Sequence, residues 1–183
     1  DAPFMAVDKA GLTLEQRIAK RTMDIIFSVC ALIVASPIML LCALAIRIED
    51  GGPVIFRQQR ATQGGEIFEI YKFRTMRPNA QHDKSATDDD QRITKVGAFL
   101  RRYRLDELPQ FVNILKGEMS VVGPRPEMLS NVRDYTRALP EFSYRLRVKA
   151  GLTGYAQIAG KYNTLPKDKM LLDLMYIENY SLW

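Results

Sequence analysis

The longest apolar stretch of the chain covers Ile25 to Ile46, where 22 consecutive residues lack a formal charge. As a straight helix this stretch would be about 33 Å long, enough to cross a hydrocarbon core of about 30 Å. A single-pass membrane anchor is therefore the simplest prediction. A cleaved signal peptide fits poorly, because the stretch is too long and no small-residue cleavage site follows it.

Ser36-Pro37 divides this stretch near its middle. Proline removes a helical N–H and clashes with the carbonyl four residues earlier, so a kink or turn is expected, and the Ser36 hydroxyl could bind a carbonyl that Pro37 frees. Each half would extend about 16 Å, roughly half a bilayer. Cations, which mark the cytoplasmic side, flank both ends: Arg17, Lys20 and Arg21 before the stretch and Arg47 after it. The pattern favours a re-entrant helix–break–helix, bent at Ser36 and Pro37, over a single span.

Shorter patterns flank the apolar stretch on both sides. Upstream, Leu12–Lys20 has apolar positions 12, 14 and 18 with charges between them, which predicts a short interfacial helix. Residues 1–11 resemble a linker from a larger protein. Downstream, aromatic and β-branched runs at Val54–Arg60 and Glu66–Arg74, separated by a glycine-containing turn, predict an antiparallel β-hairpin.

Helical patterns dominate the rest of the chain. Apolar spacing, glycines and prolines predict helices over Val96–Tyr103, Asp106–Lys116, Glu127–Leu139 and Pro166–Tyr180, with a short strand at Met119–Gly123. The fold class is therefore α+β: a mainly helical domain with a small antiparallel hairpin or sheet, plus the re-entrant membrane hairpin.

The charged and metal-binding residues limit the possible partners. The chain has 26 Lys and Arg against 21 Asp and Glu, a net charge of +5 that suits lipid headgroups, phosphates or nucleic acid without choosing among them. Cys30 and Cys42 lie in the apolar stretch and are expected to pack as small hydrophobes, and no cysteine or histidine spacing suggests zinc. His82 is the only histidine, which excludes a mechanism that needs two.

Cations gather on the predicted hairpin. They can form a solvated face, but their number favours phosphate binding. The five are Arg57, Arg60, Lys72, Arg74 and Arg77.

The segment Leu105–Gln110 is the strongest chemical signal. Pro109 is tolerated only in the first turn of a helix, so a helix is expected to start near Asp106. Asp106 and Glu107 would then lie at a helix N-terminus, where the dipole and free N–H groups should keep a carboxylate ionised. Such a carboxylate can attack phosphorus or bind Mg²⁺, although taken alone the pair also fits an ordinary N-cap and a solvated acid.

Arginines around this pair favour the chemical interpretation. Arg101, Arg102 and Arg104 precede the pair, and Arg125 lies between two prolines, Pro124 and Pro126. Carboxylates surrounded by arginines suit a diphosphate whose charge must be neutralised during displacement. Two adjacent carboxylates could divide the roles of nucleophile and of metal ligand or proton carrier.

Several motifs, in order along the chain, resemble the bacterial sugar transferases, the monotopic polyprenyl-phosphate glycosyl-1-phosphate transferases. The resemblance covers Lys20 to about Trp183. The motifs are Lys20-Arg21 with Asp24, Ser36-Pro37, Gly52-Pro53-Val54 with Phe56-Arg57-Gln58 and Arg60, Tyr71–Met76, Leu105–Gln110, Met119–Pro126 and Gly151–Gly154.

The resemblance implies a transferase that moves a sugar-1-phosphate from a UDP-sugar to polyprenyl (undecaprenyl) phosphate and releases UMP. Asp106 would be the nucleophile that forms a covalent phosphosugar intermediate and a ligand of the required Mg²⁺, with Glu107 as its partner. This would be the first membrane step in assembling exopolysaccharide, capsule, O-antigen or glycoprotein glycan. The expected phosphate- and substrate-binding residues are Arg101, Arg125, Pro124, Lys72, Arg74, Arg57 and Arg60.

The resemblance also implies a location and a domain division. The chain is expected at the bacterial inner membrane with its catalytic domain on the cytoplasmic face. Residues 1–19 would be the linker and interfacial helix, residues 20–50 the re-entrant helix and residues 51–183 the catalytic domain. Membrane lipid is an expected partner, nucleic acid is not, and an oligomer remains open, as does the identity of the sugar.

Two alternatives belong to other classes. A membrane-tethered basic module that binds lipid or nucleic acid without catalysis explains the charge and the apolar stretch, but gives no reason for Asp106-Glu107 beside arginines. A conventional glycosyltransferase would need a nucleotide-binding fold, and Asp88–Asp90 offers a metal-binding triplet only within a polar loop.

Overall fold

A computed structural model describes residues 13–77, 90–160 and 166–179. His82, Asp88 and Asp89 lie outside the described residues, as do the predicted linker and the first position of the predicted interfacial helix. The described chain is mainly helical, with two small two-stranded sheets.

The apolar stretch belongs to α1, a single helix over Leu14–Asp50. It begins at a capping box in which Thr13 Oγ1 accepts from the Gln16 N–H and Gln16 Oε1 accepts from the Thr13 N–H. It ends at Gly51, which has the left-handed conformation that glycine favours. The predicted interfacial helix is therefore not a separate element, because the capping box starts one continuous helix.

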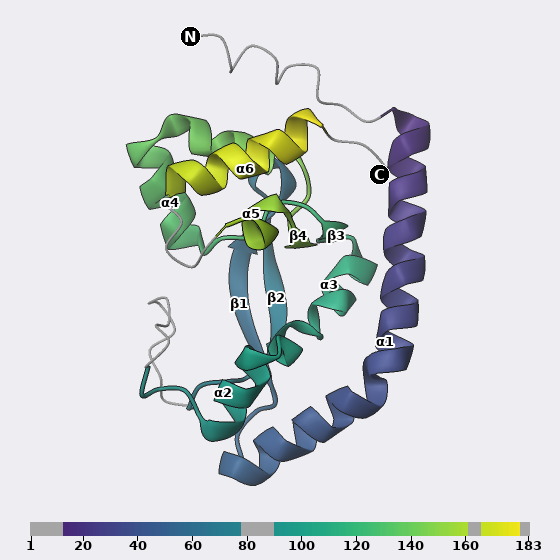
Figure 1. Cartoon of the computed structure of the whole chain (residues 1–183), viewed down its shortest axis with the longest axis vertical. Coiled ribbons are helices and arrows are strands. Elements are labelled where there is room, and N and C mark those ends of the chain that lie inside the picture. The colour runs from purple at the N-terminus through teal and green to yellow at the C-terminus, as the bar shows by residue number, and fades with distance from the viewer. Residues whose placement is uncertain (1–12, 78–89, 161–165, 180–183) are drawn as a thin grey trace.

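Pro37 lies inside α1 and does not end it. The helix changes direction part-way along its length, as Figure 1 shows, which is the kink that an internal proline produces. The carbonyl that Pro37 leaves without its helical donor is that of Ile33, and the Ser36 hydroxyl donates to this oxygen at 2.8 Å. The predicted role of Ser36 is confirmed, while the predicted break is a bend within an unbroken helix.

α1 contacts the rest of the protein along one stripe and leaves the other face exposed. Asp24, Ser28, Cys42 and Ile46 are buried, whereas large apolar side chains on the outer face remain uncovered, among them Val34 at 75% exposure. Within the described residues, α1 is the helix that is long and apolar enough to cross a membrane.

Polar side chains fix the N-terminal half of α1 to its neighbours. Arg21 donates to the carbonyls of Ile114 and Leu115 at 2.5 and 2.7 Å, at the end of α3 (Gln110–Lys116). Asp24 accepts from the Val121 N–H at 3.0 Å, in β3 (Ser120–Val122). The side chains of Arg21 and Asp24 therefore attach α1 to the end of α3, just before Gly117, and to β3, just after it.

The predicted hairpin is confirmed. β1 (Ile55–Ala61) pairs antiparallel with β2 (Ile67–Phe73), and Arg57 lies opposite Tyr71 in the register. A short 3₁₀ helix, η2 (Gln63–Gly65), makes the turn. Phe68 and Ile70 of β2 pack on Phe111, Ile114 and Met119, so α3 lies between the hairpin and α1 (Figure 1).

The second sheet was not anticipated. β3 pairs in parallel with β4 (Gly151–Thr153), so the expected antiparallel sheet is limited to the hairpin. The two strands approach so closely that a Cβ on Gly151 would lie 2.1 Å from the Gly123 backbone nitrogen. Glycine at 151 therefore permits the contact that holds the segment after β3.

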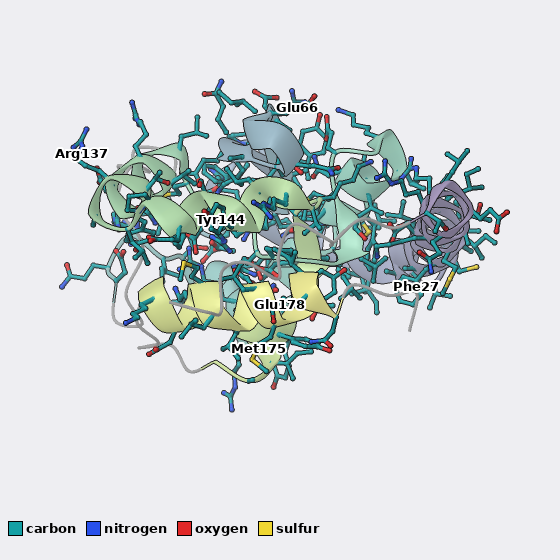
Figure 2. All side chains as sticks on the ribbon, turned by 90° about the horizontal axis from the view of Figure 1, so that it is seen from above. Phe27, Glu66, Arg137, Tyr144, Met175 and Glu178 are labelled. Carbon is teal, nitrogen blue, oxygen red and sulfur yellow. The ribbon has the colours of Figure 1, made fainter. Side chains whose placement is uncertain are left out.

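The remaining helices form a layer at the opposite end of the hairpin from α2 (Lys95–Arg102), as Figure 1 shows. α4 (Leu129–Ala138) and α6 (Pro166–Glu178) match the predicted helices, and the 3₁₀ helix η4 (Pro140–Arg147) and α5 (Tyr155–Ile158) were not predicted. Phe142 of η4 packs with Met170, Leu174 and Ile177 of α6 in a buried apolar cluster. Seen from above in Figure 2, this layer lies beside α1, which is viewed nearly end-on and carries the labelled Phe27.

Candidate active site

Asp106 and Glu107 lie in a 3₁₀ turn, η3 (Leu105–Glu107), between α2 and α3. Arg104 redirects the chain into this turn with a left-handed φ of 58°. The predicted α-helix was expected to start near Asp106, but α3 starts at Gln110 and Pro109 is its N-cap residue. The expected start of the α-helix was wrong because Pro109 precedes α3 rather than occupying its first turn, and the pair lies instead in the first turn of η3.

Glu107 binds two cations through one oxygen. Its Oε1 accepts from Lys72 Nζ at 3.1 Å and from Arg125 Nη2 at 2.6 Å. Burial favours the neutral carboxyl, but the charges of Lys72 and Arg125 outweigh burial and lower the pKa of Glu107 to about 2. Glu107 is therefore a fixed anion at neutral pH.

Asp106 has a different environment. Its side chain is buried, and among the described residues no ion pair joins it. Burial raises the pKa of Asp106, while Lys72 opposes this shift, Glu107 adds to it and Arg101 opposes it. A helix N-terminus was expected to favour the ionised form of Asp106, but here desolvation outweighs the local cations and the pKa shifts upward.

Lys72 and Arg125 come from different parts of the fold. Lys72 is the second-last residue of β2, and Arg125 follows β3 within the Pro-Arg-Pro motif. Burial and the charge of Arg125 lower the pKa of Lys72. Burial would also lower the pKa of Arg125, but Glu107 outweighs it and raises that pKa. The hairpin and the β3 segment thus meet at one carboxylate.

Arg60 and Pro124 lie next to this group. Arg60 Nη1 donates to the Pro126 carbonyl at 3.2 Å, and its buried Nε has no hydrogen-bond partner in the described part of the chain. Burial lowers the pKa of Arg60 to about 10, with Glu127 opposing the shift, so the guanidinium remains charged at neutral pH. Pro124 is buried, and its carbonyl accepts from the Gly151 N–H at 2.8 Å.

Other predicted cations have different partners. Arg101 Nε donates to Thr75 Oγ1 at 2.9 Å, close enough to Asp106 for its charge to act on that carboxyl. Arg74 pairs with Asp50 at the end of α1. Arg57 pairs with Glu69 at 3.7 Å on the exposed surface of the hairpin. The structure therefore brings Lys72, Arg125, Arg101 and Arg60 around the pair, and directs Arg74 and Arg57 elsewhere.

Two buried residues near the site had no sequence signal. Arg145 pairs with Asp173 at 2.7 Å and donates to the Arg125 carbonyl at 2.9 Å. Both lie in helical segments whose charge pattern is typical of a solvated face. Only their burial in the structure distinguishes these two residues from the solvated charges around them.

A metal ion would have few protein ligands here. Within the described residues, no group of three or more His, Cys, Asp or Glu side chains is arranged to hold one. Lys72 and Arg125 both bind Oε1 of Glu107, and Asp106 is the carboxylate of the pair that has no ion pair among the described residues. One carboxylate suits Mg²⁺ when substrate phosphates supply other ligands, so the residues fit such an ion.

Comparison with known proteins identifies the family. The profile of the bacterial sugar transferases matches residues 15–183. The chain belongs to the bacterial sugar transferase family.

Curated relatives within this family differ in the sugar that their names specify. The chain is 46% identical to a UDP-N-acetylgalactosamine-undecaprenyl-phosphate N-acetylgalactosaminephosphotransferase of Aeromonas hydrophila, over 90% of the chain and 40% of the relative. It is 43% identical to a UDP-glucose:undecaprenyl-phosphate glucose-1-phosphate transferase of Escherichia coli, over 99% of the chain and 40% of the relative. An undecaprenyl-phosphate galactose phosphotransferase of Salmonella typhimurium is 38% identical over 91% of the chain and 38% of its own length. The chain spans about two fifths of these relatives.

Proposed function

We propose that this chain carries out phosphoglycosyl transfer, moving a sugar-1-phosphate from a UDP-sugar to undecaprenyl or another polyprenyl phosphate. The main support is the asymmetry of the carboxylate pair: Glu107 is bound by Lys72 and Arg125, while Asp106 is buried without an ion pair among the described residues. The names of the relatives specify the same classes of donor and acceptor for those proteins.

Asp106 is the proposed nucleophile. An Asp106 carboxylate oxygen attacks the phosphorus that carries the sugar, and the bond from that phosphorus to the bridging oxygen breaks, so UMP leaves with the electron pair. The product is an acyl phosphate on Asp106. An oxygen of polyprenyl phosphate then attacks the same phosphorus, and the Asp106 carboxylate is restored as the lipid-linked product forms.

Glu107 is proposed to position cations rather than to react. Its low pKa keeps it charged, so Lys72 and Arg125 stay fixed beside Asp106. Fixed cations stabilise the charge that develops on the diphosphate without having to reorganise during the reaction. Arg101 and Arg60 are the proposed further phosphate contacts, and the buried Nε of Arg60 has no partner within the described residues.

Mg²⁺ is the proposed metal. Asp106 would be its protein ligand, and the ion would neutralise part of the diphosphate charge when bound. The other ligands would be phosphate oxygens and water.

The membrane location is proposed from α1. The bend at Pro37 and the uncovered apolar face would let the helix enter the bilayer and leave on the same side, with the catalytic domain at the cytoplasmic face of the inner membrane. The sugar stays open, because the relatives named above specify N-acetylgalactosamine, glucose and galactose.

The test compares the two carboxylates in detergent or nanodiscs. Wild-type protein is incubated with a panel of UDP-sugars, Mg²⁺ and polyprenyl phosphate; UMP release is measured, and covalent adducts are sought by intact-protein mass spectrometry. Asp106→Asn should form no adduct, Glu107→Gln should form one slowly, and the exposed control Glu69→Gln should match wild type. Full turnover by Asp106→Asn would exclude Asp106 as the nucleophile. No UMP from any donor, together with salt-sensitive lipid binding, would favour a non-catalytic basic module.

A further inference from the structure

Arg145 and Asp173 form a buried ion pair away from the solvent. Their side chains are 3% and 1% exposed, and Arg145 donates to Asp173 Oδ2 through Nε at 3.0 Å and Nη2 at 2.7 Å. The pair joins η4 to α6, which lie alongside each other in Figure 2, where Tyr144 marks η4. Such a pair is costly to bury, and apolar side chains often stabilise a core equally well.

The third contact of Arg145 leads towards the active site. Its Nη2 also donates to the backbone carbonyl of Arg125 at 2.9 Å. Arg125 in turn reaches Glu107 through its side chain at 2.6 Å. Hydrogen bonds therefore link Asp173 on α6 to Arg145, Arg145 to the backbone of Arg125, and the side chain of Arg125 to Glu107.

α6 makes a second attachment to the same segment. The Tyr176 hydroxyl donates to the Val122 carbonyl at 2.8 Å. Asp173 and Tyr176 are three residues apart in α6, so both lie on one face of the helix. Between the two attachments, the Gly123 N–H donates to Thr153 and the Pro124 carbonyl accepts from Gly151, at 2.8 Å each. The backbone from Val122 to Arg125 is thus held along its whole length.

We propose that Arg145, Asp173 and Tyr176 are positioning residues, which hold the Val122–Arg125 backbone so that the Arg125 side chain stays beside Glu107 and the reacting diphosphate. This inference rests on the proposed function. It assigns a role in the transfer to α6, which contributes no residue to the carboxylate pair itself.

A purely structural role predicts a different pattern of effects. If Arg145 only stabilised the fold, its loss would act equally with or without the Arg125 side chain. If it acts through Arg125, its loss should matter little once that side chain is absent. A double-mutant cycle therefore separates the two roles.

The experiment uses Arg145→Gln, Tyr176→Phe, Arg125→Ala and the two double variants with Arg125→Ala, in the full chain. Met170→Ala is the control, because Met170 is buried on α6 in the apolar cluster, so its truncation should weaken α6 packing while leaving the hydrogen bonds of Arg145 and Tyr176 to residues 122–125 in place. The readouts are single-turnover UMP release and hydrogen exchange of the peptide covering residues 121–127.

Arg145→Gln should slow UMP release at saturating donor about 10- to 100-fold in the wild-type background, the range seen when a supporting contact to a functional group is lost, and less than about twofold in Arg125→Ala. Tyr176→Phe should show the same pattern with a smaller effect. Both should raise exchange at residues 121–127 more than Met170→Ala does. Equal effects in both backgrounds, or unchanged exchange, would overturn the inference.

The outcome also separates this inference from the proposed function. If wild-type protein releases no UMP from any UDP-sugar, the proposed function fails, and the exchange measurement alone decides whether Arg145 and Tyr176 hold the segment. If wild type turns over and the effects are additive, the function stands and the positioning role is lost.

Discussion

Arg125 Nη2 donates a hydrogen bond of 2.6 Å to Glu107 Oε1, although the two residues are 18 positions apart in the sequence, Glu107 before α3 and Arg125 after it. Lys72 binds the same oxygen at 3.1 Å. Three segments, β2, η3 and the loop after β3, are thereby connected through one carboxylate. The arrangement predicts that Glu107 contributes to stability as well as to transfer.

The pH dependence of folding should report this contact. The pKa of Glu107 is about 2 in the folded protein against an ordinary value of 4.5, so its stabilising effect is present above pH 4.5 and is lost as the pH falls towards 2. The loss should be on the order of 3 kcal/mol. Glu107→Gln should flatten the fall in unfolding free energy over this range, measured by urea denaturation in detergent at each pH.

Glu69→Gln is the matched comparison, because Glu69 forms an exposed ion pair with Arg57 and should leave the pH profile nearly unchanged. An unchanged profile for Glu107→Gln would mean that its pKa is not depressed.

Lys72 should be required for transfer, and an arginine at this position should not substitute for it. The partly buried Nζ of Lys72 donates to the same Glu107 oxygen that Arg125 binds, a geometry that the larger guanidinium does not fit. Lys72→Met should reduce single-turnover UMP release by about 100-fold, a typical effect of removing one group that stabilises transition-state charge, and Lys72→Arg should restore little of it. Full activity of Lys72→Met would remove Lys72 from the site.

The sequence predicted much of the fold and proposed the residues of the candidate site, but it did not predict how they are arranged. The hairpin followed from alternating β-branched and aromatic residues, and α1 from its apolar run, because these patterns are local. The parallel pairing of Ser120 with Gly151 is non-local, and nothing in either short segment specifies its partner. The same limit applies to Asp106, whose raised pKa depends on burial by distant segments.

Arg145 illustrates the limit at the level of one residue. The charged residues around it in the sequence are typical of a solvated helix face. Only tertiary packing places Arg145 against Asp173 and the Arg125 carbonyl. The family motifs identified Arg125 itself, but not the residues that hold it.

Gly97 should be intolerant of any side chain. It is buried in α2, and a Cβ there would lie 2.1 Å from the Thr75 carbonyl oxygen, a backbone atom that cannot move aside cheaply. Gly97→Ala should therefore push α2 away from Thr75, destabilise the protein by about 3 kcal/mol and displace Arg101 from Thr75 Oγ1. Denaturant unfolding and UMP release measure the two consequences. Ala98→Ser adds an atom to the exposed side of α2 and should change the unfolding free energy by less than about 0.5 kcal/mol.

Pro37 should decide whether both ends of α1 lie on one side of the membrane. Pro37→Ala restores the helical N–H to the Ile33 carbonyl, so the helix should straighten, and a straight helix of 37 residues is long enough to cross the bilayer. Both native cysteines are first replaced by alanine, and a single cysteine is then placed at one of two exposed positions, Glu15 or Pro53. Labelling by a membrane-impermeant maleimide in sealed inside-out vesicles should reach both positions when Pro37 is present. In Pro37→Ala, protection of one position is expected, because the charged ends then face opposite sides.

Ser36→Ala is the graded comparison: it removes the hydroxyl that satisfies the Ile33 carbonyl but keeps the proline, so both ends should still be labelled. Labelling of only one end with Pro37 in place would exclude the re-entrant arrangement and favour a single span.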